Sequence, residues 1–329
     1  MNENLLYLIS FCCTFLSIFL ILKFKIWKIY SHTLNSFDKI NKEKIPTSFG
    51  IVFIFYSFLF LIFYIFLKDI KINDFGYYIF TIFTLFIIFG LIEDFFSIES
   101  TLKLLIIISF TISINLTYLN LLYLDEKIIF ILSFFYLFIL INSINFIDGS
   151  NGFLASFCLF FTLGIYIIDT FKFSSNLIFF NLLYFSIPPL IAFSYFNIKS
   201  KIFMGNVGSF YFGFLITLIV SFYLKQKILV YECLILTMYP FLDISISLFK
   251  KIIQNRNIFK KDFCFFFLQP IIRKKKSHLF VLKKFVLYNF SNLIALFIAV
   301  FYNGFLGFFL SFIFTLIIVY YYYNISFNK

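Results

Sequence analysis

Residues 50–67 read GIVFIFYSFLFLIFYIFL, a run without a single charged side chain. The next run, GYYIFTIFTLFIIFGLI at residues 76–92, has the same character. A helix needs about 17 to 25 mostly apolar residues to cross the hydrocarbon core of a bilayer, so each run is long enough to do so. The two stretches therefore predict two consecutive membrane-spanning helices.

Similar runs continue to the end of the chain. They predict further spans near residues 4–24, 102–123, 128–147, 152–168, 177–197, 208–224, 228–249, 285–302 and 304–323. We therefore expect an all-α polytopic membrane protein with about 11 transmembrane helices in a single integral membrane domain, residues 1–329. With 62% hydrophobic and 13% charged residues, the composition excludes both a soluble globular protein and a disordered one.

The basic residues predict an orientation. If the N-terminus lies outside, 21 of the 27 Lys and Arg residues fall on the cytoplasmic side and the C-terminus is cytoplasmic. Residues 250–284 alone carry 11 of them, against the single acid Asp262. The excess of positive charge on the cytoplasmic side of membrane proteins is enough to explain this basic cytoplasmic loop. An added role of the loop in attracting anionic headgroups or a phosphorylated substrate stays open.

The number of histidines and the spacing of the cysteines limit the kinds of metal site that the chain can form. His32 and His278 are the only histidines, and the five cysteines show no CxxC spacing. These are too few ligands for a structural zinc site at the usual spacings. Any metal should therefore be hard and bound by oxygen.

An acid pair forms the first of four polar clusters beside predicted cytoplasmic helix ends. Glu93 and Asp94 directly follow the span at 76–92, and Lys103 comes nine residues after Asp94. The pair favours a metal or phosphate site, with a solvated helix cap as the alternative.

The second cluster is NSINFIDGSNG at residues 142–152. Asn142, Asn145 and Asp148 recur every third residue and so lie on one side of a helix. Buried carboxamides in a membrane protein are costly unless they are satisfied, which indicates a polar ligand. Hydrogen bonding between helices is the alternative.

The other two clusters come later in the chain. KIFMGNVGS at residues 201–209 opens the eighth span, where backbone N–H groups and the helix dipole suit phosphate. Asp243 lies inside the ninth span after Pro240 and should have a cationic or hydrogen-bonding partner.

In this order the clusters resemble the polyprenyl-phosphate N-acetylhexosamine-1-phosphate transferases of glycosyltransferase family 4. EDFFSIESTLKLL at 93–105 is similar to the family's acid pair with a following Lys, NSINFIDGSNG to its Asn-x-x-Asn-x-x-Asp-Gly-x-Asp-Gly element, and FMGNVGS to its phosphate turn, usually FMGDxGS. YPFLD, the later SHLF, and KIPTSFG before the second span resemble further family elements. The resemblance covers about 45–282, with a transferase core at 76–249.

The resemblance implies transfer of N-acetylhexosamine-1-phosphate from a UDP-N-acetylhexosamine to undecaprenyl or another polyprenyl phosphate. This reaction begins a cell-envelope glycan such as O-antigen or peptidoglycan. Mg2+, or else Mn2+, is the implied cofactor, and the active site would face the cytoplasm from the cell inner membrane. The implied partners are the two substrates and the membrane, with no nucleic acid, and a homodimer is left open.

The resemblance also implies roles for individual residues. Catalytic roles fall on Glu93, Asp94, Lys103 and Asp148. Substrate-binding roles, for phosphate, uridine or sugar, fall on Asn142, Asn145, Asn151, Phe203, Gly205, Gly208, Ser209 and His278. The implied metal ligands are Asp94, Asn145 and Asn206.

Three departures from the family pattern define the main alternative. Glu93, Asn151 and Asn206 each stand where the pattern has Asp. Since a carboxamide removes a full charge from a hard-cation site, a non-catalytic relative that only binds the lipid or nucleotide sugar is a second hypothesis. A transporter or flippase is a third, but transporter sites lie near the midplane, whereas every cluster here faces one predicted side.

Overall fold

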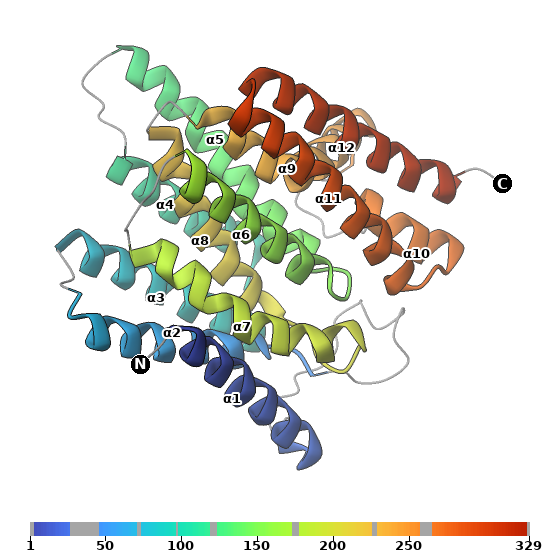
Figure 1. The fold of residues 1–329 in the computed structure, drawn as a ribbon. Coiled ribbons are helices and arrows are strands. Elements are labelled where there is room, and N and C mark those ends of the chain that lie inside the picture. The colour runs from blue at the N-terminus through green and yellow to red at the C-terminus, as the bar shows by residue number, and fades with distance from the viewer. Residues whose placement is uncertain are drawn as a thin grey trace. The chain divides into compact units, whose positions relative to one another are not determined.

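The computed structural model describes residues 3–26, 46–70, 74–96, 98–118, 124–172, 178–225, 229–256 and 265–327. Within these ranges the chain is helical with short turns and contains no strand (Figure 1). Ten of the described helices are long and apolar enough to cross a membrane, and α4 (Ser100–Tyr118) contains a shorter apolar stretch, Ser100–Leu116. The predicted class, an all-α polytopic membrane protein, is confirmed, while the orientation of the termini stays a prediction.

The chain divides into two compact units. The first unit holds Met1–Ser97 and Ser175–Leu215, and the second holds Ile98–Ser174 and Ile216–Lys329. Most of the predicted first cytoplasmic loop (27–45) and residues 257–264 of the predicted basic loop lie outside the described residues.

The first unit contains four whole helices and the beginning of a fifth. They are α1 (Glu3–Lys23), α2 (Gly50–Lys68), α3 (Asp74–Phe95), α7 (Ile178–Ile198) and the start of α8 (Gly205–Lys225). Aromatic rings fill its core: the ring of Tyr211 lies 5.0 Å from that of Phe83 and 5.8 Å from that of Phe53. A Cβ atom on Gly50 would lie 2.6 Å from the carbonyl oxygen of Met204, so only glycine lets α2 begin this close to the chain that enters α8.

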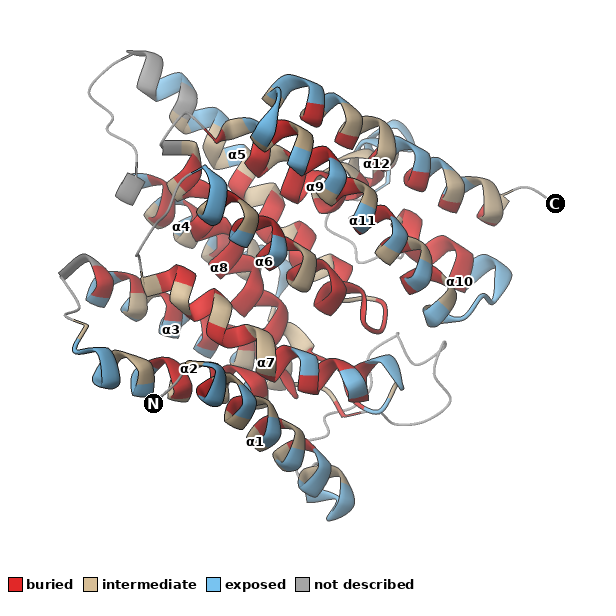
Figure 2. Ribbon diagram, viewed as in Figure 1, coloured by how far each residue is buried: buried red, intermediate tan, exposed pale blue. Residues whose placement is uncertain are grey.

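The second unit contains the remaining helices. They are α4 (Ser100–Tyr118), α5 (Leu124–Ile147), α6 (Phe153–Phe171), the rest of α8, α9 (Val230–Ile253), the 3-10 turn η3 (Phe266–Leu268), α10 (Gln269–Lys274), α11 (His278–Phe301) and α12 (Gly304–Phe327). Helices α11 and α12 pack against each other and both contact α9. In Figure 2 the faces that these helices turn toward one another are buried, and their outer faces are exposed, as expected for helices that meet lipid.

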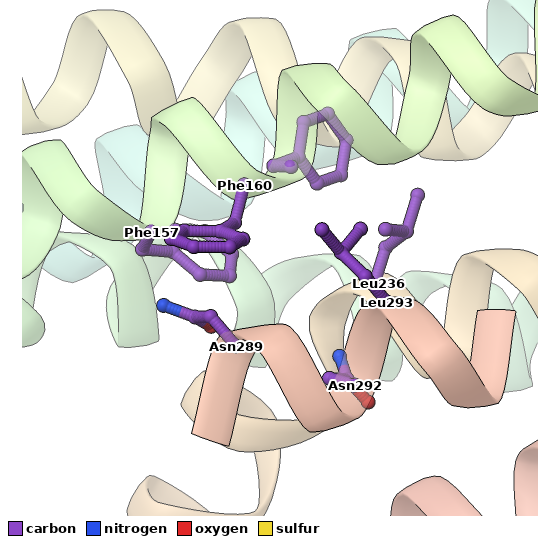
Figure 3. Close-up of a pocket in the computed structure, with 7 residues that line it drawn as sticks. Phe157, Phe160, Leu236, Asn289, Asn292 and Leu293 are labelled. Carbon is purple, nitrogen blue, oxygen red and sulfur yellow. The ribbon is translucent and has the colours of Figure 1, made fainter. Parts of the chain in front are cut away.

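Buried side-chain amides connect the helices of the second unit. Asn292 of α11 donates to the carbonyl oxygen of Ile235 on α9 at 2.8 Å and accepts from the hydroxyl of Ser311 on α12 at 2.5 Å. Figure 3 shows Asn289 and Asn292 of α11 lining a small hollow between α6, α9 and α11, with Asn289 on the side of the Phe157 and Phe160 rings. Because the amide of Asn292 is satisfied by neighbouring helices, we assign this hollow a packing role.

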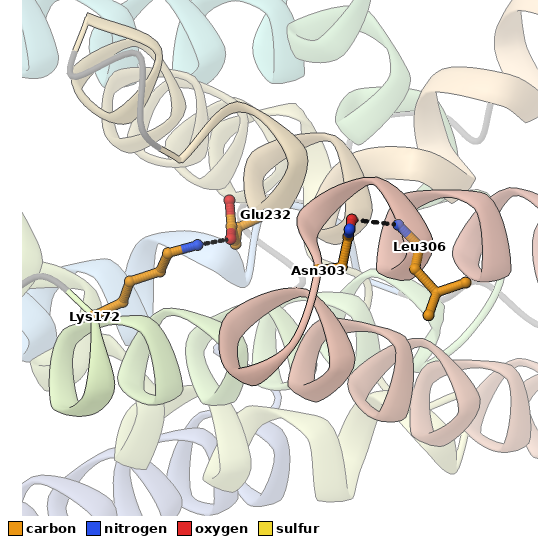
Figure 4. A network of polar contacts seen from close by, with 4 residues as sticks. All are labelled: Lys172, Glu232, Asn303 and Leu306. Atoms are coloured by element: carbon orange, nitrogen blue, oxygen red, sulfur yellow. Dashed lines mark hydrogen bonds and ion pairs between the residues drawn. The ribbon is translucent and has the colours of Figure 1, made fainter.

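An ion pair joins α6 to α9 at the end of the second unit where α6 finishes. Lys172, directly after α6, pairs with Glu232 in the first turn of α9 (Figure 4). The side chain of Glu232 is 1% exposed and that of Lys172 is 27% exposed, so the carboxylate is the buried partner. Nearby, the side chain of Asn303 accepts from the backbone N–H of Leu306 and caps α12.

Helix α11 begins seven residues before the predicted span at 285–302. Ser277 has extended backbone geometry, and its hydroxyl accepts from the backbone N–H of Phe280 at 3.2 Å, as a helix N-cap does. Lys283 and Lys284 interrupt the apolar run, which is why hydropathy alone placed the start too late.

Candidate functional site

Asp94 lies at the end of α3 and caps the N-terminus of α8. Its Oδ1 atom accepts from the backbone N–H of Asn206 at 2.7 Å, and its Oδ2 atom accepts from that of Val207 at 3.2 Å. The side chains of Ser48 and Asn206 also hydrogen-bond to Asp94. A carboxylate is stabilised at this position because the first N–H groups of a helix have no partner within the helix and the helix dipole is positive there.

The segment before α2 pairs with the chain that enters α8. The backbone N–H of Phe203 donates to the oxygen of Pro46 at 2.9 Å, and that of Phe49 donates back to the oxygen of Phe203 at 3.2 Å. Between Pro46 and Phe49, Ser48 adopts a left-handed φ of 66°, which is a strained value for a serine. Through this pairing, the PTSFG stretch at 46–50 and the FMGNVGS turn at 203–209 form one local structure.

Gly205 is required at the start of α8 for two reasons. Its φ is +77°, and an added Cβ atom would lie 2.6 Å from Oδ2 of Asp94 and 2.7 Å from the backbone nitrogen of Ser48. A side chain at this position would therefore separate Asp94 from the helix that it caps.

In the structure, backbone and side-chain groups of the predicted phosphate turn have partners within the protein. Two of its backbone N–H groups, those of Asn206 and Val207, donate to Asp94. The hydroxyl of Ser209 donates back to the oxygens of Gly205 and Asn206, and Ser209 is buried. These groups stabilise the turn itself, and its binding of phosphate stays a prediction.

Glu93 differs from Asp94 in its surroundings. Neighbouring residues on a helix point about 100° apart, so the two carboxylates of the acid pair do not share one direction. Glu93 is 8% exposed, whereas Asp94 is half-buried at the start of α8. The two acids therefore have separate environments.

His278 is the best-defined predicted site residue of the second unit. Its Nδ1 atom lies 3.1 Å from the hydroxyl of Ser150 and accepts from the backbone N–H of Asn151 at 3.4 Å. Because a backbone N–H can only donate, the neutral ring carries its proton on Nε2. Nε2 is buried and has no hydrogen-bond partner among the described residues. The Nε2–H group of His278 is therefore a buried donor without a hydrogen-bond acceptor among the described residues.

The carboxamides of NSINFIDGSNG lie at the end of α5 and in the turn that follows. Asn142 donates to the carbonyl oxygen of Phe138 at 2.8 Å, so its amide bonds to its own helix. Asn145 and Asp148 are half-buried, and Asn151 is 2% exposed. Within this stretch, Ser150 and Asn151 are the residues that hydrogen-bond to His278.

Asp243 has the hydrogen-bonding partners that its burial demands. Its carboxylate accepts from the backbone N–H of Phe266 at 3.0 Å and from the hydroxyl of Tyr239 at 3.1 Å. The predicted partner is therefore confirmed in the form of hydrogen bonds. Through Phe266, Asp243 fixes the beginning of η3 to α9.

The two units divide the predicted site residues between them. The first unit holds Glu93, Asp94, Phe203, Gly205, Asn206, Gly208 and Ser209, and the second holds Lys103, Asn142, Asn145, Asp148, Asn151 and His278. Asp94 and Asn206 meet across 112 residues of sequence, and Asn151 and His278 across 127. Convergence of all these residues on one cleft stays a prediction.

The oxygen atoms of the first unit suit a hard cation. Each carboxylate oxygen of Asp94 accepts one backbone hydrogen bond, the side chains of Ser48 and Asn206 also bond to this carboxylate, and Asn206 adds a carboxamide oxygen. In the described ranges, no three His, Cys, Asp or Glu side chains form a metal cage. These residues fit Mg2+ in the form that it usually takes, with one or two carboxylates and phosphate oxygens from the substrate.

Two residues of these arrangements were missed by the sequence interpretation. Ser48 supports Asp94, and Ser150 holds His278. Serine is too common for its type to attract notice. The family-like stretches KIPTSFG and NSINFIDGSNG were the only signals that could have identified them.

Comparison with known proteins identifies the central part of the chain. Residues 75–223 match the model of glycosyl transferase family 4, which confirms the family-level resemblance over that stretch. No curated protein matches the chain. In general terms, the family match supports a membrane-embedded phospho-sugar transferase that uses polyprenyl phosphate.

Proposed function

Because residues 75–223 carry the glycosyl transferase family 4 match, we propose that this chain transfers N-acetylhexosamine-1-phosphate from a UDP-sugar to undecaprenyl or another polyprenyl phosphate. The product would begin a cell-envelope glycan such as O-antigen or peptidoglycan. The observation that carries the proposal is the contact of Asp94 with the N-terminus of α8. It unites two family motifs that lie 112 residues apart, inside the matched stretch.

The proposed reaction is a phosphoryl transfer. A phosphate oxygen of the lipid forms a bond to the sugar-bearing phosphorus of the UDP-sugar, the bond from that phosphorus to the bridging oxygen breaks, and UMP leaves with the electron pair. Such reactions depend mainly on positioning and on neutralising charge on the phosphate oxygens. The chain's own contribution is therefore a set of fixed donors and charges.

We assign the positioning work to three groups. Asp94 accepts hydrogen bonds from the first backbone N–H groups of α8 and so fixes the conformation of the turn that contains Asn206. The Nε2–H group of His278 donates to an oxygen of the pyrophosphate or the sugar, which supplies its missing acceptor. Lys103 contributes a positive charge for phosphate.

Mg2+, with Mn2+ as the alternative, supplies charge neutralisation at the pyrophosphate when it is bound. Asp94, Asn145 and Asn206 are the side chains that would hold it. Because Asn206 brings an oxygen without a full negative charge, we expect weaker metal affinity than two carboxylates would give.

A non-catalytic relative is the second candidate, and one observation favours it. Asp94 and Asn206 satisfy each other through backbone and side-chain hydrogen bonds. These hydrogen bonds stabilise the start of α8 without a bound cation. A relative that binds its ligands but does not catalyse the transfer would not need a metal at this place.

Incubation of membranes that contain the chain with radiolabelled UDP-N-acetylhexosamine separates these candidates. The transferase should form labelled lipid in a Mg2+-dependent way, and Asp94→Asn should abolish the product because an amide nitrogen cannot accept from Val207. Asp94→Glu keeps the charge and is the matched control. A chain that forms no labelled lipid at any Mg2+ concentration, yet binds the UDP-sugar, would be the non-catalytic relative.

A further inference from the structure

A basic cluster lies at one end of the second unit, outside the predicted catalytic residues. It consists of Lys250 on α9, the consecutive residues Arg273–Lys276 at the end of α10 and in the following turn, and Lys283 and Lys284 on α11. Helix α10 packs against both α11 and α12, which brings the last turn of α12 to the same place (Figure 1). Residues 273–276 are all exposed (Figure 2).

Aromatic rings at the end of α12 lie against three cations of this basic cluster, Lys250, Arg273 and Lys284. The ring centre of Phe327 lies 4.0 Å from Cζ of Arg273 and 4.8 Å from Nζ of Lys250. Nζ of Lys284 lies 5.2 Å from the ring of Tyr321. A cation over a ring face is attracted by the ring's negative quadrupole, so these side chains are oriented more strongly than ordinary surface lysines.

Acidic residues are scarce around the basic cluster. No Asp or Glu follows Asp262 in the sequence. Asp243, on the same helix as Lys250, is 1% exposed and accepts from Tyr239 and Phe266. Its buried carboxylate is therefore directed at these donors and not at the exposed cations.

Exposed apolar side chains accompany the cations. Ile272, directly before the run 273–276, is 39% exposed, and Leu279, three residues after that run, is 48% exposed. Tyr320 on α12, next to Tyr321 in the sequence, is 65% exposed. Aliphatic groups, tyrosines and long cationic side chains occur together where a helix end meets the headgroup region of a bilayer.

We propose that the basic cluster binds the headgroups of anionic phospholipids at the membrane surface. Orientation of the chain in the membrane requires only that positive charges lie on one side. It does not require cations that are held on aromatic rings and flanked by exposed aliphatic side chains. Each cation near an anionic surface raises affinity about fivefold, so the cluster would give a strong and salt-sensitive preference.

The test compares lipid binding by two double variants that each remove two cations. Arg273→Gln with Lys276→Gln changes the basic cluster, and Lys23→Gln with Lys25→Gln changes two exposed cations at the end of α1. The full-length chain is purified in neutral detergent, titrated with phosphatidylglycerol or phosphatidylcholine, and examined by native mass spectrometry. Binding of these lipids is measured without reference to the transferase reaction.

We expect the unmodified chain to prefer phosphatidylglycerol and the Arg273 and Lys276 variant to bind it roughly 25-fold more weakly at low salt. The Lys23 and Lys25 variant should keep the preference, and Arg273→Lys with Lys276→Arg, which preserves charge, should keep most of it. Equal losses in both neutralised variants, or no preference in the unmodified chain, would overturn the proposal. Displacement of the lipid by inorganic phosphate would overturn it as well, because it would indicate a site for free phosphate.

Discussion

Replacement of Asn206 by Asp tests how the start of α8 is stabilised. In the structure the backbone and side chain of Asn206 both hydrogen-bond to Asp94. An aspartate at this position would lose the side-chain donor and would place a second carboxylate roughly 4 Å from the first. At an effective dielectric constant of about 20, this repulsion is on the order of 4 kcal/mol.

Part of this repulsion is offset because a negative charge near a helix N-terminus gains about 0.3–1 kcal/mol. We therefore expect Asn206→Asp to lower the free energy of unfolding by about 3 kcal/mol when no divalent cation is present. Mg2+ between the two carboxylates should remove most of the loss. Asn206→Ala removes the side-chain hydrogen bond without adding charge, so it should cost only about 1 kcal/mol and should not respond to Mg2+.

The assay is thermal unfolding of the detergent-purified chain in EDTA and in excess Mg2+. The aspartate variant should unfold several degrees below the unmodified chain in EDTA and should approach it in Mg2+. If the chain is an active transferase, the same variant should also need less Mg2+ for turnover. An aspartate variant as stable as the unmodified chain in EDTA would refute the reasoning, since the two carboxylates could not then be neighbours.

Three further predictions follow from the contacts of single side chains. Gly205→Ala should cost roughly 2 kcal/mol of stability and lower sugar-lipid formation, because the new Cβ atom meets Asp94 at a positive φ; unchanged unfolding and turnover would contradict this. His278→Ala should lower turnover by roughly 10- to 100-fold through loss of the Nε2–H donor, whereas His278→Gln should recover part of it, and equal rates for the two variants would argue against donation. Lys172→Met leaves Glu232 buried and without its cation, so thermal unfolding should show a loss of about 3 kcal/mol or more, and adding Glu232→Gln should recover part of that loss; no difference between the single and double variants would show that the pair is not coupled.

The helices could be predicted from the sequence because lipid imposes a simple rule. A segment that spans the hydrocarbon core must be apolar along most of its length, and runs such as residues 50–67 meet that rule without reference to the rest of the chain. The rule fails where polar residues belong to the same helix. Helix α11 starts at His278 because Ser277 caps it, and hydropathy cannot register a cap.

The candidate site was less predictable, for a physical reason. Nothing in the local sequence around Asp94 shows that its carboxylate meets backbone N–H groups 112 residues later, because that contact depends on how α3 and α8 pack. The family resemblance singled out Asp94 as a catalytic residue and both Asp94 and Asn206 as metal ligands. The hydrogen bonds between them, and the support from Ser48, became visible only in three dimensions.

The fate of the sugar-bearing phosphorus tests the central claim most directly. Membranes that contain the chain are incubated with UDP-N-acetylhexosamine labelled with 32P at the phosphate attached to the sugar, and lipid and aqueous phases are then separated. Transfer of sugar-1-phosphate to polyprenyl phosphate predicts 32P in the lipid and unlabelled UMP in water, with both products lost in the Asp94→Asn variant. Labelled UDP in the aqueous phase, with sugar but no 32P in the lipid, would contradict the account, because the bond broken would then be the one between the sugar and its phosphate.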